Sequence, residues 1–340
     1  MSAKAILGVD RTNASRRQVL GELFGFGAIA AMASPARLQA QASSPTAPLR
    51  LIVPFTPGTG IDLIARTLGP KLAERLGRPV VVENRPGASG NLGTEAVVRA
   101  PANGQTLLVT VNTLVMNRSL YSKLTFDPLK DLAPVTLTSW GQLLLVAHPA
   151  AGFKTAAELV AAARLRPGAI NYASPGVGTP HHLSMELLKE TARVFITHIP
   201  YSGTGPAVTD VLGGHVPIMF LPIHVALPHI KSGRLLGLAI GSDQRHRLLP
   251  QVPTLSEAKV GILNVDMWYG IFAPAETATE WISRINREVG EILALPEVRT
   301  AFETQGMEPA GSSAAEFSAL VERDAKRWAS LIKARGITAE

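Results

Sequence analysis

The feature that most constrains the fold is a recurring unit: a short apolar strand, a turn rich in glycine and proline, and an amphipathic helix. The first unit begins with the apolar run Leu51–Val53, passes through the turn 54–60 and enters a helical pattern over Ile61–Leu76. Apolar residues recur there every three to four positions, as one buried helix face requires. Strands that alternate with helices favour a sheet covered by helices.

The same unit recurs along the chain. Strands are predicted over 80–83 and 106–111, and each ends in a turn of small or polar residues. In the second half, a predicted strand over 170–173 is followed by the turn 174–180, and another such turn lies at 201–205. The carboxyl ends of parallel strands share one edge of a sheet, so these turns should gather. We therefore expect two similar α/β halves whose turns face one crevice.

The order of the elements predicts how the chain divides. A strand over 143–147 leads out of the first half, and Met267–Ala273 reads as a returning strand. A long amphipathic helix over 314–335 should pack on the first half and make it discontinuous. The expected lobes are 43–145 together with 267–340, and 146–266.

The N-terminus has the pattern of an export signal. Ser15–Leu20 contains paired arginines, a mildly apolar segment follows, and Ala40 and Ala42 are the small residues that signal peptidase prefers. The apolar part is too short for a permanent membrane span, which needs about 20 apolar residues. We predict a twin-arginine signal peptide over 1–42, cleavage after Ala42, and a soluble periplasmic protein.

Composition excludes several classes of function. The chain has no cysteine, so disulfides, thiolate metal sites and cysteine nucleophiles are ruled out. The net charge is +7; residues 1–42 hold five basic and two acidic residues, so the remainder carries about +4. That charge is spread along the chain without basic blocks, which argues against a nucleic-acid partner.

Candidate chemistry is sparse. All eight histidines lie within 148–246, but without the spacing of a metal site, so neither a metal nor a cofactor is predicted. No Gly-x-Ser-x-Gly elbow is present, although Ser174 or Ser202 could approach His198 or His182 in space. A secreted hydrolase therefore stays open as an alternative. The pair His181–His182 begins a helix, where it suits either an anion contact or packing.

The turns at helix starts give a positive signal for an anion. Backbone amides, hydroxyl groups and helix N-termini share a negative charge without needing arginine. Two halves joined by a hinge could close over a small carboxylate.

The chain resembles the periplasmic solute receptors of tripartite tricarboxylate transporters, the Bug family, over essentially its whole length after the signal. The motifs that carry the resemblance are 51–62 (LIVPFTPGTGID), 80–91 (VVVENRPGASGN), 171–174 (NYAS), 198–203 (HIPYSG), 206–214 (PAVTDVLGG) and 227–233 (LPHIKSG). The resemblance implies an α/β, two-lobed periplasmic binding protein of type II-like architecture. Each lobe would be a mixed sheet flanked by helices, with the ligand in the cleft between the lobes.

The resemblance also implies function. A member of this family is not an enzyme. It binds a small carboxylate and delivers it to the permease subunits of the transporter. The receptor is expected to be a monomer. The ligand-binding residues implied by position are Thr56, Thr59, Gly60, Asp62, Asn112, Thr113, Ser174, Gly178, Thr179, His182, Tyr201 and Thr204. A sensory receptor that docks on a signalling partner is a further alternative.

The sequence departs from the family pattern at three places. Thr59 stands where a second glycine is usual, Pro217 where an acidic residue is usual, and Leu221–Pro222 where a polar pair is usual. These residues indicate a less polar wall. We expect an aromatic acid or an aliphatic dicarboxylate as ligand rather than an amino acid.

Overall fold

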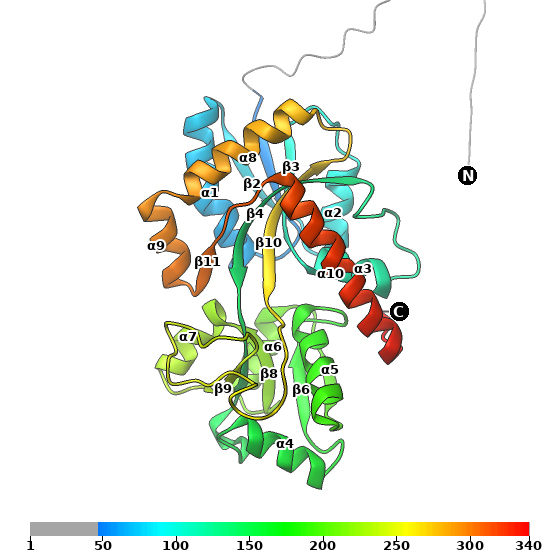
Figure 1. Cartoon of the computed structure of the whole chain (residues 1–340), viewed down its shortest axis with the longest axis vertical. Helices are drawn as coiled ribbons and strands as arrows, with labels where there is room; N and C mark the ends of the chain where they lie inside the picture. The colour runs from blue at the N-terminus through cyan, green and yellow to red at the C-terminus, as the bar shows by residue number, and fades with distance from the viewer. Residues whose placement is uncertain (1–46, 340) are drawn as a thin grey trace, which may run out of the picture. The chain divides into compact units, whose positions relative to one another are not determined.

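Two sheets organise the chain, one of six strands and one of five. Figure 1 shows the computed structural model, which describes residues 47–339. The predicted signal peptide and its cleavage site lie outside the described residues.

The six-stranded sheet forms the core of the first lobe, with the strand order β11-β4-β10-β3-β1-β2. Strand β1 pairs in parallel with the edge strand β2 and with β3, whereas β10 pairs antiparallel with both β3 and β4. The strand bounds are β1 Leu49–Val53, β2 Val80–Asn84, β3 Thr106–Val111, β4 Leu132–Gly141, β10 Met267–Pro274 and β11 Met307–Pro309. The predicted mixed sheet is thus confirmed for this lobe.

The five-stranded sheet forms the core of the second lobe, with the order β7-β6-β8-β5-β9. Strand β6 pairs in parallel with β7 and β8, and β5 pairs antiparallel with β8 and β9. The strand bounds are β5 Leu143–Ala147, β6 Asn171–Ser174, β7 Thr197–Pro200, β8 Ile218–Pro222 and β9 Leu236–Ile240. Every residue of β5 and β8 is buried, as expected for central strands covered on both faces.

Helices flank each sheet (Figure 1). In the first lobe they are α1 Gly60–Leu76, η1 Ala88–Gly90, α2 Asn91–Val98, α3 Thr113–Leu120, α8 Thr279–Leu293, α9 Pro296–Thr304 and α10 Ala314–Arg335. In the second lobe they are η2 Pro149–Ala151, α4 Ala156–Leu165, α5 Pro180–Ala192, α6 Thr204–Leu212 and α7 Ile223–Lys231. Within residues 47–339, none of the helices combines the length and the apolar character that crossing a membrane requires.

The chain changes lobe between neighbouring strands. Strand β4 ends at Gly141 in the first sheet and β5 begins at Leu143 in the second, so the change falls before the predicted boundary at 145 and 146. The return enters the first sheet with β10 at Met267. These two crossings define the hinge.

The C-terminal helix α10 ties the return strand into the first lobe. The ring of Phe317 packs onto Gly270 of β10 and meets Trp268 edge-on, with the ring centroids 5.4 Å apart. Asp324 accepts a hydrogen bond of 2.8 Å from the Trp268 indole and is buried. A charged residue of an amphipathic helix is expected on its solvated face. Asp324 is buried instead, because the indole needs a buried acceptor.

Candidate functional site

A cavity of about 380 Å³ lies between the two lobes. Its wall is built from the turns that precede α1 and α2, the starts of α3, α5, α6 and α7, and the first residues of β10. The turns before α1, α2, α5 and α6 and the end of β3 were predicted to face one crevice, whereas the start of α7 and the first residues of β10 were not predicted to lie there. The approach between lobes is close, because a Cβ built on Gly176 would lie 3.9 Å from the Ser89 hydroxyl.

The start of α1 offers unpaired amides to this cavity. Thr59 is the N-cap, and its hydroxyl donates to the Thr56 carbonyl over 3.1 Å rather than capping the helix. The first helical bond is donated by Leu63 to the Thr59 carbonyl. The amides of the three residues between them therefore have no intrahelical acceptor, and a helix N-terminus of this kind favours an anion.

Asp62 lies behind this turn rather than in the cavity wall. It is 4% exposed, and its carboxylate accepts hydrogen bonds from the Gly58 amide at 3.0 Å, the Asn84 amide at 2.9 Å and the Arg66 guanidinium at 3.0 Å. Burial raises the pKa of Asp62, but the donors Arg66, Gly58 and Asn84 outweigh that effect, so the pKa lies below its ordinary value. The geometry makes Asp62 a support of the turn.

The start of α5 repeats the same construction. Thr179 is the N-cap, its hydroxyl donates to the Gly176 carbonyl at 2.8 Å, and its carbonyl accepts from the Leu183 amide. The Gly178 amide donates to Nδ1 of His182 over 2.9 Å. Pro180 occupies the first helical position, where it has no amide hydrogen to leave unpaired.

His182 belongs to a buried cluster behind the α5 start. Its ring stacks on His198 with centroids 4.1 Å apart, and His198 in turn stacks on Tyr172 at 4.7 Å. Burial, with a smaller effect of Lys189, lowers the pKa of His182 to about 4. Burial, with a smaller effect of His182, lowers the pKa of His198 to about 3. Both rings are therefore neutral at pH 7.

Ser174 touches His198, but the pair does not face a substrate site. The Ser174 hydroxyl lies 2.6 Å from Nε2 of His198 and also bonds the amide and carbonyl of Gly176. Ser174 is fully buried and does not line the cavity. Because the pKa of His198 is so low, its imidazole is a poor base for activating the Ser174 hydroxyl. The contacts of Ser174 with Gly176 instead stabilise the turn before α5.

The start of α6 supplies the third turn of the second lobe. Tyr201 and Thr204 line the cavity, and the N-cap Gly203 has φ 142°, a conformation that favours glycine. The Tyr201 hydroxyl donates to Asp210 over 2.6 Å. Burial and the bond to Asp210 raise the pKa of Tyr201 to about 12, so its hydroxyl stays protonated.

The turn before α2 is strained where it faces the cavity. Four successive residues, Gly87 to Gly90, have positive φ, and two of them, Ala88 and Ser89, are not glycine. Such backbone persists only where its surroundings fix it. Asn117 donates to the Ser89 carbonyl at 2.9 Å, and the Tyr121 hydroxyl donates to the Ser89 hydroxyl at 3.2 Å.

The structure divides the residues implied by the resemblance into two sets. Lining the cavity are Thr56, Thr59, Gly60, Thr113, Thr179, Tyr201 and Thr204. Behind the wall are Asp62, Asn112, Ser174, Gly178 and His182. Asn112 is 1% exposed, and its amide donates to the Asp266 carbonyl at 3.3 Å. Contact of either set with a ligand stays a prediction.

Six polar residues of the wall were not among the predicted ligand contacts: Ser89, Tyr121, His181, Ser202, His224 and Tyr269. Of the pair at the α5 start, His181 faces the cavity while His182 turns into the lobe. Helix α7 was not expected, because Pro228 interrupts a short segment, and so His224 had no assigned place. The adjacency of His181 to a helix start was the one available signal.

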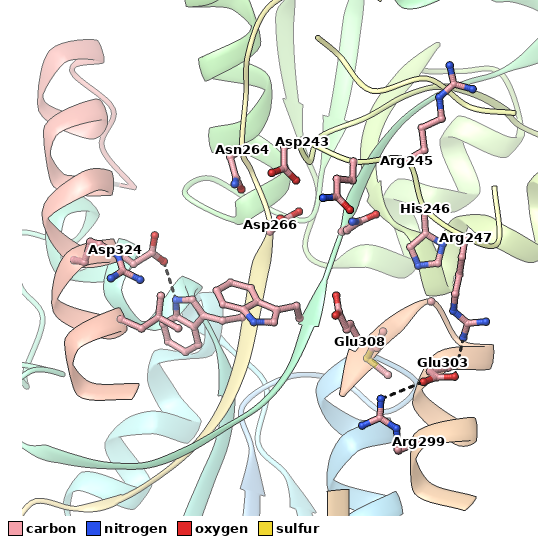
Figure 2. A pocket seen from close by; sticks show the side chains of 18 of the residues that line it. Asp243, Arg245, His246, Arg247, Asn264, Asp266, Arg299, Glu303, Glu308 and Asp324 are labelled. Carbon is pink, nitrogen blue, oxygen red and sulfur yellow. Dashed lines mark hydrogen bonds and ion pairs between the residues drawn. The ribbon is translucent and has the colours of Figure 1, made fainter. Parts of the chain in front are cut away.

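A second, more polar cleft of about 820 Å³ lies beside the hinge crossings (Figure 2). It is lined by Trp140 and Gln142 at one crossing and by Asp266 and Trp268 at the other. Figure 2 shows the ion pairs that join Glu303 to Arg247 and Arg299. The Arg247–Glu303 pair, at 3.2 Å, connects the two lobes. In the described part of the chain, no His, Asp and Glu side chains are grouped to hold a metal ion.

Two mixed sheets joined by hinge crossings, with a cavity between helix starts, define a two-lobed periplasmic binding protein. The profile of the tripartite tricarboxylate transporter family receptor matches residues 64–337. The chain belongs to this family of solute receptors, as the sequence motifs predicted.

Related proteins align with this chain over most of its length and of their own. A protein from the tcbD-tcbE intergenic region of Pseudomonas sp. strain P51 is 35% identical, covering 95% of each chain. Protein BugT of Bordetella pertussis is also 35% identical, covering 86% of this chain and 90% of its own.

Solved structures confirm the fold. An R. palustris protein with adipate superposes with a TM-score of 0.81 at 31% identity, covering 85% of this chain and 97% of its own. MatC from Rhodopseudomonas palustris, with bound malate, gives a TM-score of 0.77 at 30% identity, covering 84% of this chain and 98% of its own.

Proposed function

We propose that this chain is a periplasmic receptor that binds a small carboxylate between its lobes and delivers it to the permease of a tripartite tricarboxylate transporter. It performs no catalysis, needs no cofactor, and works as a monomer exported by the twin-arginine route. The observation that carries the proposal is the start of α1. Its unpaired amides line the cavity beside the hydroxyl groups of Thr56, Thr59 and Thr113.

Two further observations support a carboxylate. Relatives with about 30% identity have been solved with adipate and with malate. The second lobe brings Thr179, Tyr201 and Thr204 to the same cavity. The hydroxyl groups of Thr179 and Tyr201 already donate to Gly176 and Asp210, so Thr204 is the one of these three that offers a hydroxyl donor to a ligand. Closure between the lobes would remove the carboxylate from water and strengthen these contacts.

A thermal-shift screen against carboxylates tests this proposal. A ligand at 100 times its dissociation constant stabilises the folded protein by about 2.7 kcal/mol, which is readily measured. The expected result is a set of carboxylate hits that are recovered chemically unchanged. Turnover of a hit would contradict the receptor assignment, and a screen without any carboxylate hit would contradict the ligand class.

A further inference from the structure

Two imidazoles of the second lobe line the cavity. His181 lies at the start of α5 and His224 at the start of α7. Among the described residues of the wall, these two rings carry the only side-chain nitrogen atoms. They are therefore the side-chain N–H donors that the cavity can offer to an anion.

His181 has no hydrogen-bond partner in the described part of the chain. The residue is 8% exposed, and both of its ring nitrogens are buried and unpaired. Buried polar side chains in folded proteins nearly always have a partner, and an unpaired one costs free energy. Because the ring lines a cavity, a molecule bound in that cavity can supply the missing partner.

His224 approaches the start of α1 across the two lobes. A Cβ built on Gly60 would lie 2.8 Å from Cε1 and 3.0 Å from Nε2 of His224, so the ring lies against the Gly60 backbone. Gly60 is the first residue of α1 and carries one of its unpaired amides. The same Cβ would lie 3.2 Å from the hydroxyl of Tyr269, which the first lobe contributes through β10. Donors of both lobes thus meet at one end of α1.

An imidazole can donate to a carboxylate in either protonation state, since the neutral ring has one N–H and the protonated ring has two. Burial, with a smaller effect of His224, lowers the pKa of His181 to about 3, and that second effect marks the two rings as neighbours. A carboxylate has two oxygen atoms with about four acceptor sites. The amides at the start of α1 therefore leave acceptor sites for donors of the opposite lobe.

We propose that His181 and His224 bind the carboxylate held at the start of α1, so that this one anion joins the two lobes and holds them closed. The inference rests on the proposed carboxylate receptor function and assigns to it the contacts of the second lobe. A ligand with one carboxylate or with two fits this arrangement. Closure without the anion is disfavoured, because it leaves the buried imidazole of His181 unpaired.

Titration calorimetry tests the two contacts. Adipate, malate, benzoate and butanoate are titrated into the wild-type protein, and the tightest binder of the four serves as the probe. His181→Phe and His224→Phe keep a flat ring but remove its nitrogen atoms. Each should weaken binding of the probe about tenfold or more, as the loss of a hydrogen bond to a charged group predicts.

Conservative variants and a matched control separate donation from shape. His181→Gln and His224→Gln keep an N–H donor, so they should recover part of the affinity that the Phe variants lose. His229→Gln, on the same helix as His224 but outside the cavity wall, should bind the probe like the wild-type protein.

Urea unfolding without ligand separates binding from a structural role. His181 has no hydrogen bond to lose, so His181→Phe should leave the midpoint of unfolding unchanged or raise it. A histidine that stabilised the start of α5 would instead lower the midpoint when replaced.

Energy transfer between two dyes measures closure. The chain has no cysteine, so the dyes can be attached through Glu74→Cys in α1 and Arg166→Cys at the end of α4, both exposed positions. Saturating probe should change the transfer efficiency of the otherwise wild-type protein. The double variant His181→Phe with His224→Phe should show much less change at saturation, because its second lobe no longer binds the anion.

Unchanged affinity for the probe in either Phe variant would overturn the inference and leave the receptor function intact. Full closure of the double variant, or an affinity loss that the Gln variants do not reduce, would also overturn it. Failure of all four carboxylates to bind the wild-type protein would overturn the inference together with the proposed function.

Discussion

The junctions at the starts of α1 and α5 have the same hydrogen-bond geometry, but the acceptor is charged in the first and neutral in the second. In each, a threonine N-cap donates to the carbonyl three residues earlier, and a glycine amide donates to a side chain four residues later. That acceptor is the carboxylate of Asp62 in the first junction and the imidazole of His182 in the second. The two lobes thus use one backbone design with two different acceptors.

The difference shows how each lobe stabilises its turn. Asp62 keeps its charge because Arg66 lies beside it at the protein surface, where the guanidinium side chain is 53% exposed. His182 is packed between rings inside the lobe and stays neutral. The first turn is therefore stabilised by a charged acceptor, and the second by a buried, neutral acceptor. Different substitutions and conditions should weaken the two turns.

The largest expected effect comes from adding one methyl group to the second junction. Gly58 and Gly178 both have left-handed backbone, with φ 82° and 78°, but a Cβ on Gly58 meets nothing within 4 Å whereas one on Gly178 would lie 2.1 Å from Leu120 of the first lobe. Both alanine variants should lose about 1–2 kcal/mol of unfolding free energy. Gly178→Ala should in addition weaken carboxylate binding more than tenfold, because the lobes cannot close fully.

Calorimetry and urea unfolding of both variants measure these effects. The double variant Gly178→Ala with Leu120→Ala removes the clash and should recover most of the affinity, while Gly58→Ala serves as the matched control. Equal affinities for Gly58→Ala and Gly178→Ala would show that the contact across the lobes is not needed for binding.

Acid should weaken the second junction before the first. In the folded protein the pKa values of His182 and His198 are about 4 and 3, below the ordinary value of 6.5. At a pH between the folded and the ordinary pKa values, the unfolded chain therefore binds more protons than the folded protein. Stability falls there as the pH drops from 6.5, by about 1.4 kcal/mol per pH unit for each histidine. The lowered pKa of Asp62 acts in the same direction only below its ordinary value of 3.8.

Amide hydrogen exchange between pH 7 and 4.5 measures this difference, once corrected for the intrinsic pH dependence of exchange. Protection of the Gly178 amide should fall faster than that of Gly58, since a protonated imidazole cannot accept its bond. His182→Asn, which keeps an acceptor that does not titrate, should flatten the profile. Loss of protection at Gly58 first would contradict the assignment.

Much of this architecture could be predicted from the sequence, because each helix start follows a strand with a recognisable turn. The predicted bounds of β3, β5 and α10 agree with the structure. Helices α3, α7 and α9 were not predicted, since they are short and their stability comes from tertiary packing. Which of His181 and His182 faces the cavity depends on the ring stack with His198, a contact between residues distant in the sequence. No local pattern reports such a contact.

Removing the acceptor of the first junction should cost stability more than affinity. Asp62→Ala leaves the Gly58 and Asn84 donors without their partner, and a lost acceptor of this kind costs about 1–3 kcal/mol. Asp62→Asn keeps an acceptor and should cost less. Chemical unfolding and calorimetry of the two variants distinguish the roles. A large loss of affinity with unchanged stability would place Asp62 in contact with the ligand or its waters, as the sequence resemblance implied.

The smallest expected effect concerns the hinge side, where Arg247 of the second lobe pairs with Glu303 of the first. The Arg247 side chain is 57% exposed and that of Glu303 35%, so water screens the pair, which is worth between zero and about 1 kcal/mol. Arg247→Ala should therefore change carboxylate affinity less than fivefold, and 0.5 M NaCl should abolish the difference. Arg299→Ala, which removes a neighbour of Glu303 within one lobe, is the matched control. A larger change that persists in salt would mean that this contact, rather than the two junctions, sets the balance between open and closed lobes.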